Sequence, residues 1–343
     1  MKKIELYKSF LNSKRPIQKS ILSRIENTLK NDFIYNSNAI EGNSLTRQET
    51  EVILEYGVTV KGKPLKDHLE VKGQEYAINF LNNIIKENEV LSLKLIKEFH
   101  SLILGPVDPE IAGQFKKFKN KIAGSTFETS DPIFVEEDLE KLLKDYFSSN
   151  ENIIEKIAKF HANFEKIHPF SDGNGRVGRL LIPLYLLDKE MLKKPCFYIS
   201  NFFEKNRIDY YDCLSRVREK NDILTWILFF LNGVIATAQD AKNKFHQVVQ
   251  LVKEYENILN TSVKGSWENK SKILNAFYNE PILRVNQIIE KTNLSKATIS
   301  NILKSFIENE ILFEKKNDDN VEIKRNKQYI LKKYLDIFSK GIE

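Results

Sequence analysis

The stretch Ile167–Arg179 reads IHPFSDGNGRVGR and decides how the rest of the chain is interpreted. Ahead of it, apolar residues from position 151 onward recur at the spacing of one helix face, and helical periodicity resumes after it from Arg176. We therefore expect a helix, a glycine-rich loop and a second helix. Pro183 lies inside the second helix and predicts a kink or a local break there.

The loop suits an anion such as a phosphate group. The start of the second helix presents unpaired backbone N–H groups and the positive end of the helix dipole. Gly173 and Gly175 leave room for a phosphate to approach the backbone, and Asn174 adds a side-chain amide donor. Arg176 and Arg179 share a face of the helix and offer two guanidinium groups to phosphate oxygens.

Two more side chains complete a site for phosphate chemistry. Asp172 can hold a hard cation through oxygen, and Mg²⁺ usually accompanies a polyphosphate. His168 has the side chain whose ordinary pKa suits proton abstraction near neutral pH. Each of these residue types alone more often belongs to a capped loop with solvated charges. The prediction of a phosphate site therefore depends on finding all of them within one short stretch. No Gly-Lys-Ser/Thr follows the glycines, which excludes a Walker A loop.

Residues 168–179 (HPFSDGNGRVGR) resemble the Fic family signature, HxFx(D/E)GNGRxxR, at every specified position. Enzymes of this family typically transfer AMP from ATP to a protein hydroxyl. The resemblance implies a helical Fic-type domain in which His168 deprotonates the target Ser, Thr or Tyr and Asp172 carries Mg²⁺. It also implies that the nucleotide is held by Gly173, Asn174, Gly175, Arg176 and Arg179, with the two arginines at the β/γ end.

A second match lies far upstream, in Ser37–Asn43 (SNAIEGN). This segment looks like the family's inhibitory helix, (S/T)xxxE(G/N), with Ser37, Glu41 and Gly42 at the specified positions. The resemblance implies that Glu41 pairs with Arg179 and occupies the guanidinium that should bind the γ-phosphate. In some relatives the same glutamate helps to remove AMP, so a reverse deAMPylation is conceivable. Four-residue spacing alone is equally explained by a capped helix start.

Residues 111–134 alternate apolar and polar side chains and contain two glycines, which predicts a β-hairpin. The segment is similar to the family's flap, which docks a target segment by strand addition, here through Ile122, Ala123 and Gly124. Lys116 stands where arginine is usual, and Asn120 where an apolar residue is usual. The register of the flap and the choice of target are therefore left open.

The aromatic and histidine residues outside the loop are less specific. Tyr210 and Tyr211 resemble the region that borders the adenosine, but tyrosines on an apolar helix are equally explained as core residues. His100 and His161 lie on apolar helix faces and are predicted to be packed core residues. The fold expected over most of the chain is mainly α-helical.

We predict three domains: an N-terminal helical segment (1–110), a catalytic core with the flap (111–260), and a winged helix-turn-helix (261–343). In the tail, residues 282–291 and 296–308 are expected to form helices, and residues 311–315 and 324–331 to form the paired strands of a wing. Basic residues only slightly outnumber acidic ones in the tail. DNA binding and protein docking are thus equally compatible with it.

The overall composition describes a folded protein, with 41% hydrophobic and 29% charged residues among 343. Its two cysteines form neither a metal-binding spacing nor a disulfide framework, which favours a reducing, cytoplasmic location. Residues 180–187 and 223–231 are too short to span a bilayer, so no membrane partner is expected. A net charge of +6 does not by itself demand nucleic acid.

The function predicted is an autoinhibited protein adenylyltransferase with Mg²⁺ as cofactor, and with ATP and a hydroxyl-bearing target protein as partners. A homodimer is one arrangement that the sequence leaves open. The alternative from another class is a nucleotide-sensing, DNA-binding transcription regulator with little catalysis. Transfer of phosphate instead of AMP is a third option, which the intact GNG and both arginines disfavour.

Overall fold

The computed structural model describes residues 19–87, 91–120, 128–188, 197–315 and 327–339. Most of these residues are helical, as expected, and the described strands form one small antiparallel sheet. The chain divides into two compact units. We call Leu29–Gln239 the central unit, and the described residues of 1–28 and 240–343 the terminal unit.

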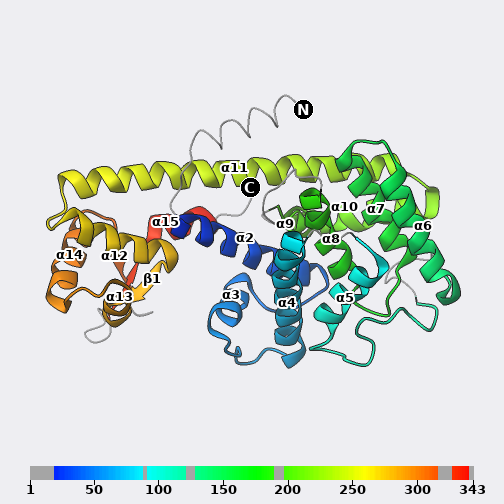
Figure 1. The fold of residues 1–343 in the computed structure, drawn as a ribbon, viewed down its shortest axis with the longest axis horizontal. Helices are drawn as coiled ribbons and strands as arrows, with labels where there is room; N and C mark the ends of the chain where they lie inside the picture. Colours follow the sequence, from blue (N-terminus) through cyan, green and yellow to red (C-terminus); the bar gives the residue numbers. More distant parts are fainter. Residues whose placement is uncertain (1–18, 88–90, 121–127, 189–196, 316–326, 340–343) are drawn as a thin grey trace. The chain divides into compact units, whose positions relative to one another are not determined.

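The central unit consists of helices and the loops between them (Figure 1). Two long helices, α2 and α11, begin or end in the terminal unit. In chain order the elements are α2 (Lys19–Ile40), α3 (Arg47–Tyr56), α4 (Leu65–Glu87), α5 (Leu93–Leu104), η1 (Pro132–Phe134), α6 (Val135–Ser148), α7 (Ile153–Ile167), α8 (Asn174–Asp188), α9 (Ser200–Lys205), α10 (Arg207–Lys220) and α11 (Ile223–Thr261).

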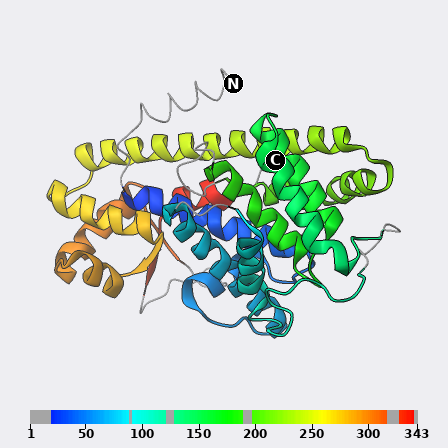
Figure 2. The same cartoon turned by 45° about the vertical axis from the view of Figure 1, so that its right-hand side comes forward.

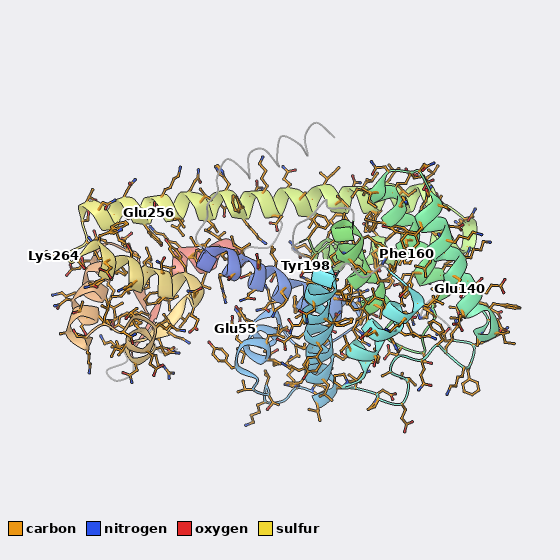
Figure 3. The ribbon with its side chains drawn as sticks, viewed as in Figure 1. Glu55, Glu140, Phe160, Tyr198, Glu256 and Lys264 are labelled. Carbon is orange, nitrogen blue, oxygen red and sulfur yellow. The ribbon has the colours of Figure 1, made fainter. Side chains whose placement is uncertain are left out.

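Helices α4, α5 and α8 lie side by side, as Figures 1 and 2 show. The α4–α5 contact is close because Gly73 has no side chain, and a Cβ there would overlap the carbonyl oxygen of Ile103. Helix α7 packs against α8, and Phe160, labelled in Figure 3, is buried against Tyr146 and Tyr185. These contacts fix the two helices that flank the loop. Helix α8 continues across Pro183, so no break occurs there.

The terminal unit holds the small sheet. Its elements after α11 are α12 (Trp267–Asn279), β1 (Ile282–Arg284), α13 (Val285–Thr292), α14 (Lys296–Glu308), β2 (Phe313–Glu314), β3 (Gln328–Ile330) and α15 (Lys332–Ser339). The strand order is β1-β3-β2, with both pairs antiparallel. Helix α14 has the predicted bounds, and the predicted pairing of the last two strands is present. The prediction of one helix over 282–291 is wrong at its start, because residues 282–284 pair with β3.

The two units do not coincide with the predicted boundaries after residues 110 and 260. Helix α11 is continuous, and its residues Trp226 and Phe230 belong to the apolar core of the central unit. Tyr255 and Leu259 of the same helix belong to the core of the terminal unit. Because one uninterrupted helix serves both cores, no change of composition marks the division near residue 240.

In the described parts of the segment predicted as a β-hairpin, residues 111–120 and 128–134, the structure has no paired strands. Residues 111–120 and 128–134 form turns, bends, one isolated bridge residue and η1. Side chains join the two parts instead: Lys119 Nζ lies 3.5 Å from Asp131 Oδ2, and the Thr129 hydroxyl lies 3.0 Å from the Asn120 carbonyl oxygen. The predicted docking residues Ile122, Ala123 and Gly124 lie outside the described residues.

Among the described residues, α11 alone is long and apolar enough to cross a membrane by length and composition. This corrects the prediction that no segment reaches that length, which ended the segment at Leu231. The helix continues through Gly233, where a Cβ would lie 2.6 Å from the ring of Phe202. Of this apolar window 22% is buried, and Trp226 and Phe230 of α11 are among the buried residues of the central unit.

Candidate active site

The loop begins where α7 ends, at His168. This residue has the left-handed backbone conformation, with φ 52° and ψ 62°, and its N–H group donates to the Phe164 carbonyl. Residues other than glycine adopt this conformation uncommonly, and such positions are often functional. The turn ends the helix and places the imidazole at the entrance of the loop.

Asn174, the first residue of α8, closes the loop with its side chain. Its Oδ1 accepts from the Phe170 N–H at 2.8 Å, and its Nδ2 donates to the Phe170 carbonyl at 2.8 Å. The side chain is 2% exposed. The sequence predicted this amide as a phosphate donor, but the structure uses it to hold the loop, because a buried amide needs partners within the protein.

The first turn of α8 has the backbone features expected of an anion site. Gly173 has a φ of 76°, and a Cβ there would overlap the Leu104 side chain, so only glycine lets the loop pack on α5. The first backbone N–H groups of a helix have no partner within it, and they lie at the positive end of its dipole. Residues 174–176 therefore present amides suited to a phosphate.

His100 of α5 fastens this loop from behind. Its Nδ1 accepts from the Gly113 N–H at 2.9 Å, so its Nε2 carries the proton and donates to the Asp172 carbonyl at 3.0 Å. The ring stacks on Phe170 with centroids 3.7 Å apart. Burial, partly offset by the Asp172 carbonyl, lowers the pKa of His100 to about 4, which keeps this neutral tautomer.

The sequence predicted only that His100 is buried. Its burial is confirmed, but its two hydrogen bonds were missed. Its partners lie 13 and 72 positions along the chain, and no local pattern reveals them.

Arg176 is almost fully buried and has acidic neighbours. Its Nη1 lies 3.2 Å from Glu70 Oε1 on α4, and its Nη2 lies 3.3 Å from Asp172 Oδ1. Glu70 also accepts from Asn43 Nδ2 at 2.9 Å, just beyond the end of α2. Arg176 was predicted to bind nucleotide phosphates, and here it links α8 to α4 and orients Asp172.

Arg179 meets the end of α2. Its Nη2 donates to Glu41 Oε1 at 2.7 Å and to the Ser37 carbonyl at 2.8 Å, while its Nε donates to the Ser37 hydroxyl at 3.2 Å. Gln74 donates to the same hydroxyl at 2.8 Å. Burial is the largest single influence and lowers the pKa of Arg179, but the charge and hydrogen bond of Glu41, together with Tyr210 and Tyr211, outweigh it and the net shift is upward. The contact expected from the sequence is thus present.

The position of Glu41 depends on the turn that follows it. Helix α2 ends at Ile40, and Gly42 has a φ of 92°, a conformation that favours glycine. Asn43 then anchors the chain, because its Nδ2 donates to the carbonyl of Asp67 at 3.1 Å. The predicted set of Ser37, Glu41 and Gly42 is therefore brought to one place beside α8.

Asp172 fits the role of a magnesium ligand. Its side chain is 51% exposed at the loop. The described residues contain no group of three His, Cys, Asp or Glu side chains suited to a metal. Mg²⁺ beside a polyphosphate needs only one or two carboxylates, because phosphate oxygens and waters supply the other ligands.

His168 is neutral in this environment. Burial, followed by the charges of Lys116 and Arg218, lowers the pKa of its imidazole to about 4. A neutral ring is the form that accepts a proton. Its Nδ1 lies 3.9 Å from Glu165 Oε2, and burial raises the pKa of this carboxyl to about 7.

The two tyrosines differ from each other. Tyr210 is 1% exposed, and its hydroxyl lies 3.0 Å from His161 Nε2 within a cluster that includes Trp226. Tyr210 is therefore a core residue in this structure, which is the alternative that the sequence left open. Tyr211 is half-buried, and its hydroxyl donates to the Ile40 carbonyl at 3.3 Å. Of the two tyrosines, Tyr211 has the more accessible side chain for contacting a nucleotide.

Comparisons with known proteins agree with this geometry. Residues 90–186 match the family model described as Fic/DOC family. Over 160 residues the chain is 36% identical to protein adenylyltransferase fic-1 of Caenorhabditis elegans, covering 45% of this chain and 31% of that protein. It is 28% identical over 243 residues to protein adenylyltransferase Fic of Drosophila virilis, covering 68% and 50%.

The solved structure of Fic-1 from C. elegans is 27% identical to this chain, with a TM-score of 0.60, and the match covers 71% of this chain and 72% of that one. The chain spans between about a third and a half of the length of the two curated relatives. The signature loop, its helical frame and these matches agree, and residues 90–186 of this chain are similar to the Fic/DOC family.

Proposed function

We propose that this chain is an autoinhibited protein adenylyltransferase that transfers AMP from ATP to a Ser, Thr or Tyr hydroxyl of a target protein, itself included. The observation that carries the proposal is the convergence of three parts. A neutral His168, the open amides of α8 and the Glu41–Arg179 pair all lie at one loop. The relatives named protein adenylyltransferase support the same activity.

In the proposed reaction the ATP phosphates lie against the first amides of α8. His168 removes the proton from the target hydroxyl, whose oxygen forms a bond to the α-phosphorus. The bond from this phosphorus to the bridging oxygen of the β-phosphate breaks, and pyrophosphate leaves with that electron pair. Positioning and charge stabilisation supply most of the acceleration. Loss of the base alone lowers the rate by roughly 10²–10⁴-fold.

Mg²⁺ on Asp172 would neutralise charge on the polyphosphate when bound. Arg176 supports this role through its 3.3 Å contact with Asp172 Oδ1, which holds the carboxylate at the mouth of the loop. The alignment of the α-phosphorus with the target hydroxyl then depends on the loop itself. Its shape is set by the hydrogen bonds of Asn174 and His100.

Inhibition in this proposal is competition for one guanidinium. Arg179 is 1% exposed and already donates to Glu41 and Ser37, so a γ-phosphate must displace Glu41 to reach it. A hydrogen bond to a charged group contributes about 1.5–3 kcal/mol, which corresponds to a roughly ten- to hundredfold effect. The same carboxylate, near His168, gives a route to activating water for deAMPylation.

A second candidate function comes from the terminal unit. Its helix, strand, two helices and two paired strands follow the order of a winged helix-turn-helix, and we propose that assignment for residues 261–343. Helix α14 turns Lys296, Ser300, Asn301 and Lys304 to solvent. A polar, lysine-bearing helix of this kind suits DNA or an acidic protein surface. This observation supports a DNA- or protein-binding role, which the alternative function, a nucleotide-sensing regulator with little turnover, requires.

One labelling experiment separates these functions. Wild type and Glu41→Gly are incubated with ATP labelled at the α- or at the γ-phosphate, and label on protein is measured. Label from the α-position alone supports AMP transfer, whereas label from the γ-position supports phosphate transfer. Binding of ATP with neither label on protein would overturn the transferase proposal in favour of the sensor. Glu41→Gly with His168→Ala is the control for chemistry at the loop.

A further inference from the structure

Lys116 is a buried cation that contacts three separate parts of the central unit. Its ammonium nitrogen donates to Asn120 Oδ1 at 2.9 Å, to Thr129 Oγ1 at 2.8 Å and to the Ile167 carbonyl at 3.2 Å. Its backbone N–H donates to the Pro169 carbonyl at 2.9 Å. The residue therefore bonds on both sides of His168.

The chemistry of the ammonium fits this arrangement. A lysine has three N–H donors, and here each has its own oxygen acceptor. The side chain is 3% exposed, and burial lowers the pKa of Lys116 to about 8, so the ammonium with all three hydrogens prevails at neutral pH. Leaving any of these buried groups without a partner would be costly.

Asn120 completes the connection. Its Oδ1 accepts from Lys116 and lies 2.7 Å from the Thr129 hydroxyl, while its Nδ2 donates to the Phe170 carbonyl at 2.8 Å. The same carbonyl accepts from Asn174, the residue that closes the loop. The base of segment 111–134 and the loop closure thus share an acceptor. The two departures from the family pattern, Lys116 and Asn120, lie in hydrogen-bond contact with each other.

We propose that Lys116 and Asn120 form a coupled positioning pair. They hold both described ends of segment 111–134 against the loop, and so set where a target hydroxyl meets His168. Lysine and asparagine belong together here, because each supplies the donor or acceptor that the other needs. The inference rests on the proposed transferase function for its catalytic consequence, but its structural part stands without it.

The pair is expected to act on the target and not on ATP. Its contacts reach Ile167, Pro169 and Phe170, which precede the phosphate-binding amides of α8. Those amides have further support that does not involve the pair, because Asn174 Oδ1 accepts from the Phe170 N–H and His100 donates to the Asp172 carbonyl. Loss of the pair should therefore change how a polypeptide is presented while leaving the nucleotide affinity nearly unchanged.

The structural arm measures amide hydrogen exchange on the full chain. In Lys116→Met and in Asn120→Ala, exchange should rise about tenfold or more in peptides covering 111–120 and 128–134, and stay unchanged in α10. Lys117→Met, at the exposed neighbouring position, is the matched control and should match wild type. Unchanged exchange in segment 111–134, or an equal rise throughout the central unit, would overturn the proposal.

The catalytic arm uses the Glu41→Gly background and α-labelled ATP. Adding Lys116→Met or Asn120→Ala should lower self-labelling about tenfold, while the Kd for ATP changes by no more than about twofold.

Coupling is tested with Lys116→Arg, Asn120→Val and the double variant. If the two residues are coupled, the double variant should retain more label than the product of the fractions retained by the two single variants. A double variant that retains only that product would contradict coupling. If Glu41→Gly itself yields no label, the transferase function is wrong. The hydrogen-exchange measurement still tests whether Lys116 and Asn120 hold segment 111–134 in place.

Discussion

The Glu41 carboxylate occupies the space in which a side chain at position 175 would lie. A Cβ on Gly175 would overlap Glu41 Oε1 and lie 2.8 Å from Arg179 Nη1. Gly175 is also in the first turn of α8, where the open amides are. The absence of a side chain at position 175 therefore leaves space for the Glu41 carboxylate. The same space would admit the phosphate that we propose takes its place.

Gly175→Ala separates these two requirements. The added methyl group should push Glu41 away from Arg179, yet it also fills the place of the phosphate. We expect this variant to lose the ion pair without gaining activity, in contrast to Glu41→Gly. Incorporation of α-labelled AMP into Glu41→Gly, Gly175→Ala and the double variant checks this. Activation of Gly175→Ala to the level of Glu41→Gly would show that the phosphates do not use this turn.

His100→Phe tests the support behind the loop. Phenylalanine keeps the stacking on Phe170, but it cannot accept from the Gly113 N–H or donate to the Asp172 carbonyl. The free energy of unfolding should fall by about 1–3 kcal/mol, because two buried groups lose their partners. Urea unfolding measures the change, and AMP transfer in the Glu41→Gly background should fall with it. His246→Phe, at an exposed position, is the control and should unfold like wild type.

Glu165 predicts a pH-dependent stability. Burial raises the pKa of its carboxyl from 4.5 to about 7, so the folded protein holds this proton more tightly than the unfolded chain does. The contribution of Glu165 to stability is thus fully present below about pH 4.5 and is lost as the pH rises through 7.

Glu165→Gln keeps the shape of the side chain and removes the titration. It should raise the free energy of unfolding by about 1–3 kcal/mol near pH 8 and by much less near pH 5. Denaturant unfolding at the two pH values measures this. Glu155→Gln, on the same helix at a side chain that is 39% exposed, should show no such pH dependence. An equal effect of Glu165→Gln at both pH values would mean that the carboxyl is not shifted.

The parts of the site that could be predicted from sequence are those whose chemistry is local or matches a family motif. The loop, its helical flanks and the bounds of α14 follow from periodicity and from helix-capping residues within a few positions. The contact between Glu41 and Arg179 joins residues 138 positions apart. Only the family resemblance supplied it, because no spacing rule links side chains over that distance.

Where local patterns left two explanations open, tertiary partners decide between them. The side-chain amide of Asn174 could bind a ligand or the protein backbone, and in this structure it forms two hydrogen bonds with the Phe170 backbone. Tyr210 could face a ligand or the core, and the aromatic cluster around Trp226 decides for the core. Residues 282–284 have a helical pattern, yet they form a strand because β3 lies beside them.

A comparison of initial rates tests whether Glu41 holds Arg179 away from the nucleotide. Initial rates of α-labelled AMP incorporation are measured for wild type, Glu41→Gly and Glu55→Gly, the last a change at an exposed residue of α3 labelled in Figure 3. We expect a roughly ten- to hundredfold higher rate in Glu41→Gly and the wild-type rate in Glu55→Gly. Equal rates in wild type and Glu41→Gly, with ATP bound by both, would contradict it.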